Sequence, residues 1–145
     1  GWNDLTFDEN IFQFAASPAP GRNVLLFAKG DRVNGSPEWT GSAGADYGIP
    51  TPLAGLDLVF SSSYTYGSQR PLRFLSGGRL DQTHLDEIRL LRASLGLEGR
   101  NWEVELYGDN LLNDDGAISP PNASGAFTAV RQRPRTIGLQ ATFNY

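Results

Sequence analysis

The sequence predicts an all-β fold, and residues 136–145 are the first observation that predicts it. Apolar side chains occupy every second position from Ile137 to Tyr145, with small or polar side chains between them. This period of two is that of a β-strand with one apolar and one polar face. Four further segments alternate in the same way. The 145 residues also include 17 glycines, 9 prolines and 11% aromatic residues, a composition typical of strands joined by turns.

The four upstream strands are expected at 39–49, 56–66, 89–98 and 102–109. A partial strand near the start of the chain would raise the number from five to six. The alternation is broken where the third of these segments begins, and a helix over 84–95 is the alternative there. We favour a strand that is entered after a bulge.

The connections between these strands alternate between short and long. Residues 50–55 and 99–101 are short linkers, whereas 67–87 and 110–135 are long and polar. Short turns on one side and long loops on the other, with strands of about 9–11 residues, are typical of outer-membrane barrels. The predicted fold is therefore an antiparallel transmembrane β-barrel fragment of about five to six meander strands.

Aromatic side chains support this prediction, because they lie mostly near strand ends and share the apolar face. Such positions match the aromatic girdles of membrane barrels, although aromatic residues are also enriched in ordinary strands. The members of this set are Trp39, Tyr47, Tyr64, Tyr66, Trp102, Phe143 and Tyr145.

Composition excludes several classes of function. A net charge of −4 argues against nucleic acid as a partner, and the absence of cysteine removes disulfides and thiol chemistry. No run of about 18 apolar residues is present, so a transmembrane helix is not expected. The chain starts at Gly1 without a signal peptide, and we expect residues 1–145 to be the C-terminal part of a longer protein.

Three stretches of the sequence together resemble the barrel of TonB-dependent outer-membrane receptors. Residues 30–39 (GDRVNGSPEW) are similar to the family's Gly-x-Arg-x-x-x-x-Pro segment, which leads into a downward strand. Residues 101–114 (NWEVELYGDNLLND) are similar to its penultimate strand with an Asn-Leu-x-Asp type motif. Residues 133–139 (RPRTIGL) are similar to its Pro-Arg-x-x-Gly last strand. The terminal Tyr145 stands where Phe or Trp is commoner in the family.

The resemblance implies a receptor in the bacterial outer membrane that imports a scarce large ligand of the iron-siderophore, cobalamin or oligosaccharide class. It implies outer-membrane lipid, the barrel-assembly machinery and the TonB energy-coupling complex as partners, the last through a plug domain that this chain lacks. Loops 67–87 and 110–135 would capture the ligand, and their arginines are the candidate ligand-binding residues: Arg70, Arg73, Arg79, Arg131 and Arg133. The last strand would carry the assembly signal, formed by Ile137, Leu139, Phe143 and Tyr145.

Two alternatives come from other classes, a smaller passive porin and a soluble, secreted β-sandwich used for binding. An enzyme is not expected, because no catalytic constellation is present, and neither a cofactor nor a metal is expected. His84 beside Asp86 and Glu87 is better explained as a solvated side chain than as a ligand set. The acidic run at 109–115 is better explained as a turn than as a calcium loop.

The acidic side chains of the polar strand face are the remaining candidates for chemistry. Paired carboxylates can serve as general acid and base. Lining a water-filled interior against a plug is the simpler expectation for them. The polar-face charges in question are Asp46, Asp57, Arg92, Glu98, Glu103, Glu105 and Asp109.

Overall fold

The computed structural model describes residues 1–15, 22–52, 55–119 and 130–144. Its strands form three antiparallel sheets, and the described residues contain no helix. The predicted all-β class is therefore confirmed. Nothing in the described ranges amounts to a helix with the length and apolar character needed to cross a membrane. The chain divides into two compact units, which are described separately below.

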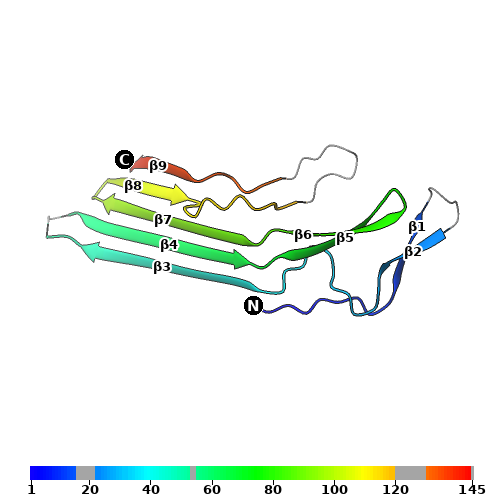
Figure 1. Ribbon diagram of the computed structural model, residues 1–145. Coiled ribbons are helices and arrows are strands. Elements are labelled where there is room, and N and C mark those ends of the chain that lie inside the picture. Colours follow the sequence, from blue (N-terminus) through cyan, green and yellow to red (C-terminus); the bar gives the residue numbers. More distant parts are fainter. Residues whose placement is uncertain (16–21, 53–54, 120–129, 145) are drawn as a thin grey trace. The chain divides into compact units, whose positions relative to one another are not determined.

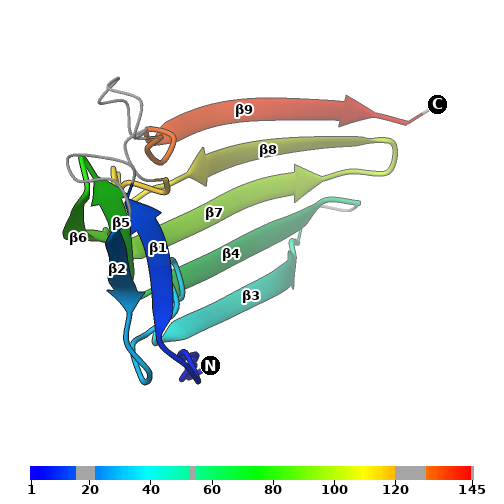
Figure 2. The ribbon, with the colours of Figure 1, turned by 90° about the vertical axis from the view of Figure 1, so that its right-hand side faces the viewer.

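The second unit contains a five-stranded sheet in the order β3-β4-β7-β8-β9. Figures 1 and 2 both show these strands side by side in one layer. Their bounds are Thr40–Pro50 (β3), Asp57–Gly67 (β4), Ile88–Glu98 (β7), Trp102–Asp109 (β8) and Thr136–Phe143 (β9). The five predicted strands are thus confirmed to within two residues at each end, and the helix considered at 84–95 is wrong.

Strand register keeps apolar and polar side chains on opposite faces of this sheet. In one row Leu95 of β7 pairs with Leu106 of β8, which pairs in turn with Leu139 of β9. In the neighbouring row of the other face, Gly96 pairs with Glu105, which pairs with Gln140. Because side chains alternate with a period of two, a slip of one residue would mix the faces. The sequence pattern therefore fixes this register.

The two short connections lie at one end of the sheet. Figure 1 shows the end of β3, the start of β4 and the β7–β8 turn at the end where β9 also finishes. In the β7–β8 turn, the Gly99 N–H donates to the carbonyl of Trp102 over 2.8 Å, as expected for a tight hairpin. The predicted alternation of short and long connections is confirmed. None of the three sheets closes on itself over the part of the chain that the structure describes.

The first unit contains two hairpins, β1 (Ile11–Ala15) with β2 (Arg22–Phe27), and β5 (Arg70–Ser76) with β6 (Arg79–Leu85). Their small core contains Phe27 and Leu85, the two buried apolar side chains of the described residues. Phe7 stacks on Phe27 with ring centroids 4.3 Å apart.

Residues 67–87, predicted as a long polar loop, form mainly the β5–β6 hairpin. Gly77 and Gly78 both have positive φ, at 55° and 78°, and they form its two-residue turn. Only a primed turn has this geometry, and glycine adopts it without steric cost. The Gly-Gly pair between two alternating runs was the signal for this hairpin, and the charged residues around it obscured the alternation.

Candidate functional site

The apolar face of the five-stranded sheet is the main unusual surface of the molecule. Leu95, Leu106 and Leu139 form one row across three strands, yet they are 46%, 51% and 71% exposed. None of the apolar side chains that the structure describes in this sheet is buried. Other large apolar side chains of the sheet that are exposed include Tyr47, Ile49, Phe60, Tyr64, Leu97, Ile137 and Phe143. Exposed apolar surface on this scale marks a site of contact with lipid or another protein.

A shallow hollow of about 300 Å³ lies on this face. Phe60, Leu106 and Ile137 are among its walls, and Ala93 and Gly108 also line it. The hollow exists because the row Ala93–Gly108–Ile137 has two small members, so the sheet surface drops between larger neighbours. Leu111 folds back over Gly108, where a Cβ atom would lie 2.5 Å from its Cδ2.

The opposite face carries polar contacts between neighbouring strands. The Ser61 hydroxyl donates to the carboxylate of Asp46, which joins β4 to β3. Arg92 of β7 pairs with Asp109 of β8, with Nε and Oδ1 2.9 Å apart. These residues border a second open hollow of about 220 Å³, which Ser61, Arg92 and Asp109 help to line. Polar and charged side chains therefore predominate on this part of the face.

An aromatic side chain covers a glycine on this polar face. Tyr107 pairs directly with Gly138 of β9, and a Cβ atom on Gly138 would lie 2.5 Å from the Tyr107 hydroxyl oxygen. The ring therefore uses the space that the missing side chain leaves. Aromatic rings placed over glycines in this way stabilise strand pairing and fix register.

Asn110 joins the second and third resemblance stretches at the end of β8. Its side chain is buried, with 5% exposure, and its Nδ2 donates to the carbonyls of Asp114 and Arg133 over 2.8 and 2.7 Å. Its Oδ1 accepts from the Asp114 N–H over 2.9 Å. Asn113 similarly accepts from the Arg135 N–H over 3.2 Å. Asn110 and Asn113 have φ of 49° and 55°, a conformation that asparagine tolerates better than most residues.

These bonds confirm the turn predicted at residues 109–115. The Asn113 N–H donates to the carbonyl of Asn110 over 2.8 Å, which closes the turn. The sequence did not indicate that Asn110 is buried or that it bonds to the segment before β9. Those facts depend on where the chain returns after the long connection.

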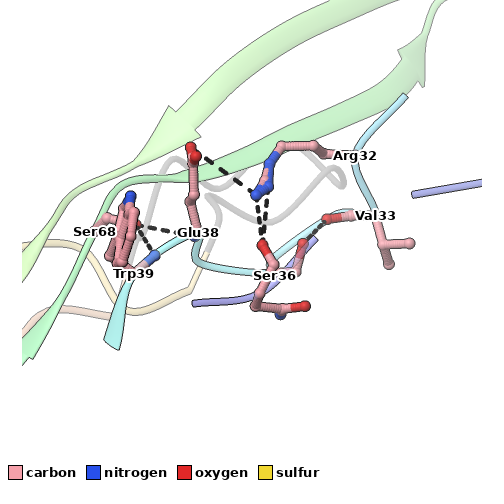
Figure 3. A network of polar contacts seen from close by, with 7 residues as sticks. Arg32, Val33, Ser36, Glu38, Trp39 and Ser68 are labelled. Atoms are coloured by element: carbon pink, nitrogen blue, oxygen red, sulfur yellow. Dashed lines mark hydrogen bonds and ion pairs between the residues drawn. The ribbon is translucent and has the colours of Figure 1, made fainter. Parts of the chain in front are cut away.

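The first resemblance stretch forms an ordered polar segment in the first unit. Arg32 donates to the carbonyl of Asn3, and its Nη2 lies 3.9 Å from the carboxylate of Glu38. Ser68 accepts from the N–H groups of Glu38 and Trp39, both over 3.0 Å. Figure 3 shows Arg32 reaching Glu38, with Ser68 beside Trp39. This segment is therefore held by side chains as well as by its backbone.

Asp31 and Asn34 connect the same stretch to β5. Asp31 accepts from the Ala28 N–H and pairs with the Arg73 guanidinium, and these two contacts lower the pKa of its carboxyl below the ordinary value of 3.8. Asn34 donates to the Arg73 carbonyl over 2.7 Å and accepts from the Arg73 N–H over 2.9 Å. The side-chain amide of Asn34 thus forms, with the backbone of Arg73, two hydrogen bonds of the kind that a neighbouring strand would form.

The structure distributes the five predicted ligand-binding arginines over different environments. Arg70 donates to the carbonyl of Ala117, and Ala117 forms an isolated bridge with Arg131, so residues from two predicted loops meet there. Arg73 is paired with Asp31, whereas Arg79 is exposed at the start of β6. Arg133 belongs to the other unit. Within the first unit, Arg70 and Arg131 thus meet at Ala117, whereas Arg73 and Arg79 have other surroundings.

The other predicted site residues fall on strands or outside the described residues. Ile137, Leu139 and Phe143 are exposed on the apolar face of β9, and Tyr145 lies outside the residues that the structure describes. His84 is exposed on β6. Over the described ranges, no group of three His, Cys, Asp or Glu side chains is placed to hold a metal ion.

Comparison with known proteins identifies no relative of this chain. Neither a protein-family model, nor a curated protein, nor a solved structure matches the chain.

Proposed function

We propose that this chain is part of the wall of an outer-membrane β-barrel, and that the whole protein is a TonB-dependent receptor. In this proposal the five-stranded sheet crosses the membrane with its apolar face toward lipid and its polar face toward the lumen. By its resemblance to the family, the chain corresponds to the C-terminal part of the barrel. The imported ligand would be scarce and large, of the iron-siderophore, cobalamin or oligosaccharide class.

One observation carries the membrane assignment, namely the paired rows of exposed apolar side chains on a single face. Leu95, Leu106 and Leu139 pair across three neighbouring strands, yet all three side chains are exposed. Exposing such a face to water is costly, at about 25 cal/mol per Å² of apolar surface. Lipid removes that cost, and the polar opposite face then suits a water-filled lumen.

Strand length and connection geometry also support the membrane assignment. β3, β4 and β7 each have 11 residues, enough to cross a hydrocarbon core at a tilt. The short connections lie at one end of the sheet, as periplasmic turns do in such barrels. The sheet would be completed by further strands, because an open edge in lipid leaves backbone groups without partners.

The receptor class rests on the resemblance, and the contacts of Asn110 add to it. The penultimate-strand motif and the last-strand motif are recognised separately in the sequence, and Asn110 connects them through the carbonyl of Arg133. By the resemblance, residues 67–87 would be an extracellular segment. Ligand capture there would involve exposed groups such as Arg79.

A cysteine-labelling experiment tests the membrane assignment, and these 145 residues contain no native cysteine that would also be labelled. Leu139→Cys and Gln140→Cys would be introduced singly into the gene at its natural locus and spin-labelled in membranes. We expect the label at 139 to collide with oxygen, which concentrates in lipid, and the label at 140 to collide with a water-soluble nickel chelate. Leu106→Cys and Glu105→Cys provide a second pair of opposite faces.

The outcome separates the proposal from a soluble sandwich. If the protein remains in solution without detergent and the label at 139 is shielded from both reagents, the apolar face is covered by protein and the membrane assignment fails. In a passive porin, the labels at 139 and 140 would collide with oxygen and with the nickel chelate as they do in a receptor. The coding sequence upstream of residue 1 separates these two, because a receptor requires a plug-sized domain ahead of further strands and a porin lacks one.

A further inference from the structure

The hollow of about 220 Å³ on the polar face of the sheet is lined by residues of β4, β7 and β8. Ser61 and Ser63 of β4 and Ser94 of β7 contribute small side chains to it. Tyr107 of β8 also lines it, but the far end of its ring lies over Gly138 of β9. The hollow therefore exists because three lining side chains are small and the Tyr107 ring leans toward β9.

Three charged residues complete the polar lining of this hollow. Arg92 and Asp109 are paired, with Nε and Oδ1 2.9 Å apart, and Glu105 is the third. Glu105 is half-buried, and no residue that the structure describes forms a hydrogen bond or an ion pair with its carboxylate. The oxygens of Glu105 therefore remain available as acceptors, whereas the other two charges already satisfy each other.

This lining disfavours several classes of ligand. An anion would meet two carboxylates and one guanidinium, and that guanidinium is already paired. An apolar ligand would remove water from hydroxyl and carboxylate groups without replacing their hydrogen bonds. For a metal ion, the described residues assemble no group of three His, Cys, Asp or Glu side chains. A neutral ligand rich in hydroxyl groups avoids these costs, because a hydroxyl both donates and accepts hydrogen bonds.

We infer that this hollow binds one sugar ring of a neutral oligosaccharide. Glu105 accepts hydrogen bonds from the sugar hydroxyls, the serine hydroxyls donate and accept, and the Tyr107 ring contacts the C–H groups of the sugar. Pockets for whole drug-sized ligands measure about 300–1,000 Å³. A hollow of about 220 Å³ therefore suits one unit of a longer chain. This inference rests on the proposed function, and it narrows the imported ligand to the oligosaccharide class.

Binding of the membrane-extracted protein, expressed from its natural gene, to an array of neutral and uronic-acid-containing oligosaccharides tests this site. A polyoxyethylene detergent is used, because maltoside and glucoside detergents carry competing sugars. We expect binding to neutral oligosaccharides and not to acidic ones. In calorimetric titration with the neutral oligosaccharide that binds best, Glu105→Ala should weaken binding about tenfold. Glu98→Ala is the matched control, because Glu98 is a β7 carboxylate of the same face that does not line the hollow.

A second variant tests the hollow itself. Ser94→Leu fills it and should abolish binding while labelling at 139 and 140 stays as in the unaltered protein. The inference is overturned if no neutral oligosaccharide binds, if acidic ones bind equally well, or if both Glu105→Ala and Ser94→Leu bind as the unaltered protein does. Absent sugar binding with the expected labelling contradicts the sugar site alone. Sugar binding together with a shielded label at 139 contradicts the membrane assignment alone.

Discussion

At the scale of single residues, Asn110 is the side chain on which most local order depends. It satisfies three backbone groups from one buried position and adopts a positive φ. Buried polar groups that lose a partner are costly, because no water replaces the lost bond. The turn after β8 and the approach to β9 therefore depend on this one amide.

We predict that Asn110→Ala destabilises the protein by about 2–4 kcal/mol, from the lost hydrogen bonds and the positive φ. Asn110→Gly is the matched control, because glycine tolerates this φ and loses only the hydrogen bonds. Urea unfolding of the detergent-solubilised protein measures both variants. Equal stability of Asn110→Ala and the unaltered protein would contradict the role assigned to this side chain.

Asp31 gives a prediction about pH at the same scale. Its folded-state pKa is lowered by the Ala28 N–H and by Arg73, so the carboxylate stabilises the fold at pH values above its unfolded pKa. This contribution is lost as the pH falls through the lower, folded-state pKa. We expect Asp31→Asn to be less stable than the unaltered protein near neutral pH.

The difference between Asp31→Asn and the unaltered protein should shrink below about pH 4, where the carboxyl of the unaltered protein becomes protonated. Hydrogen exchange of the segment around residues 28–35, followed between about pH 3 and pH 7, measures this. A difference that stays constant down to the lowest pH would show that the charge of Asp31 is unimportant.

At the scale of elements, strand pairing in the sheet depends on complementary sizes as well as on alternation. Tyr107 lies over Gly138 on the polar face, and Leu111 lies over Gly108 on the apolar face. Each large side chain occupies the space above a glycine. These contacts join β8 to its neighbour and to its own following turn, and they add specificity that alternation alone does not provide.

Gly138→Ala is expected to destabilise the β8–β9 pair by about 1 kcal/mol, because the new methyl group displaces the Tyr107 ring. The ring is at the end of a movable side chain, so the cost is modest. In the background of Tyr107→Ser the same change should cost nothing, and a double-mutant cycle measures the coupling. Additive effects of the two changes would mean that the ring and the glycine do not interact in the folded protein.

At the scale of the whole molecule, the sheet lacks the core that a soluble domain of this size requires. Two apolar side chains are buried among the described residues, and both belong to the first unit. The sheet of the second unit has an exposed apolar face and two open edges. Open edges and apolar faces both promote association between chains.

The 145-residue chain expressed alone should therefore aggregate in buffer and become dispersed in detergent. Size-exclusion chromatography with and without a mild detergent checks this. A monodisperse, folded species in plain buffer would favour the soluble sandwich over the membrane wall.

The sequence by itself determined the five strands of the sheet, their two faces and the alternation of short and long connections. It did so because a period of two repeats along each strand and specifies which side chains share a face, as for Leu139 and Gln140. The turn at 109–115 was also predictable, because Asn and Asp favour such turns through their own side chains.

Only the tertiary structure decided which distant residues meet. The pairing of Asp31 with Arg73 and the burial of Asn110 beside Arg133 both depend on contacts between segments far apart in the chain. Such contacts leave no periodic trace in sequence, because a charge or an amide looks the same whether it faces water or a partner. The placement of these polar side chains was therefore decided by chain packing and not by local pattern.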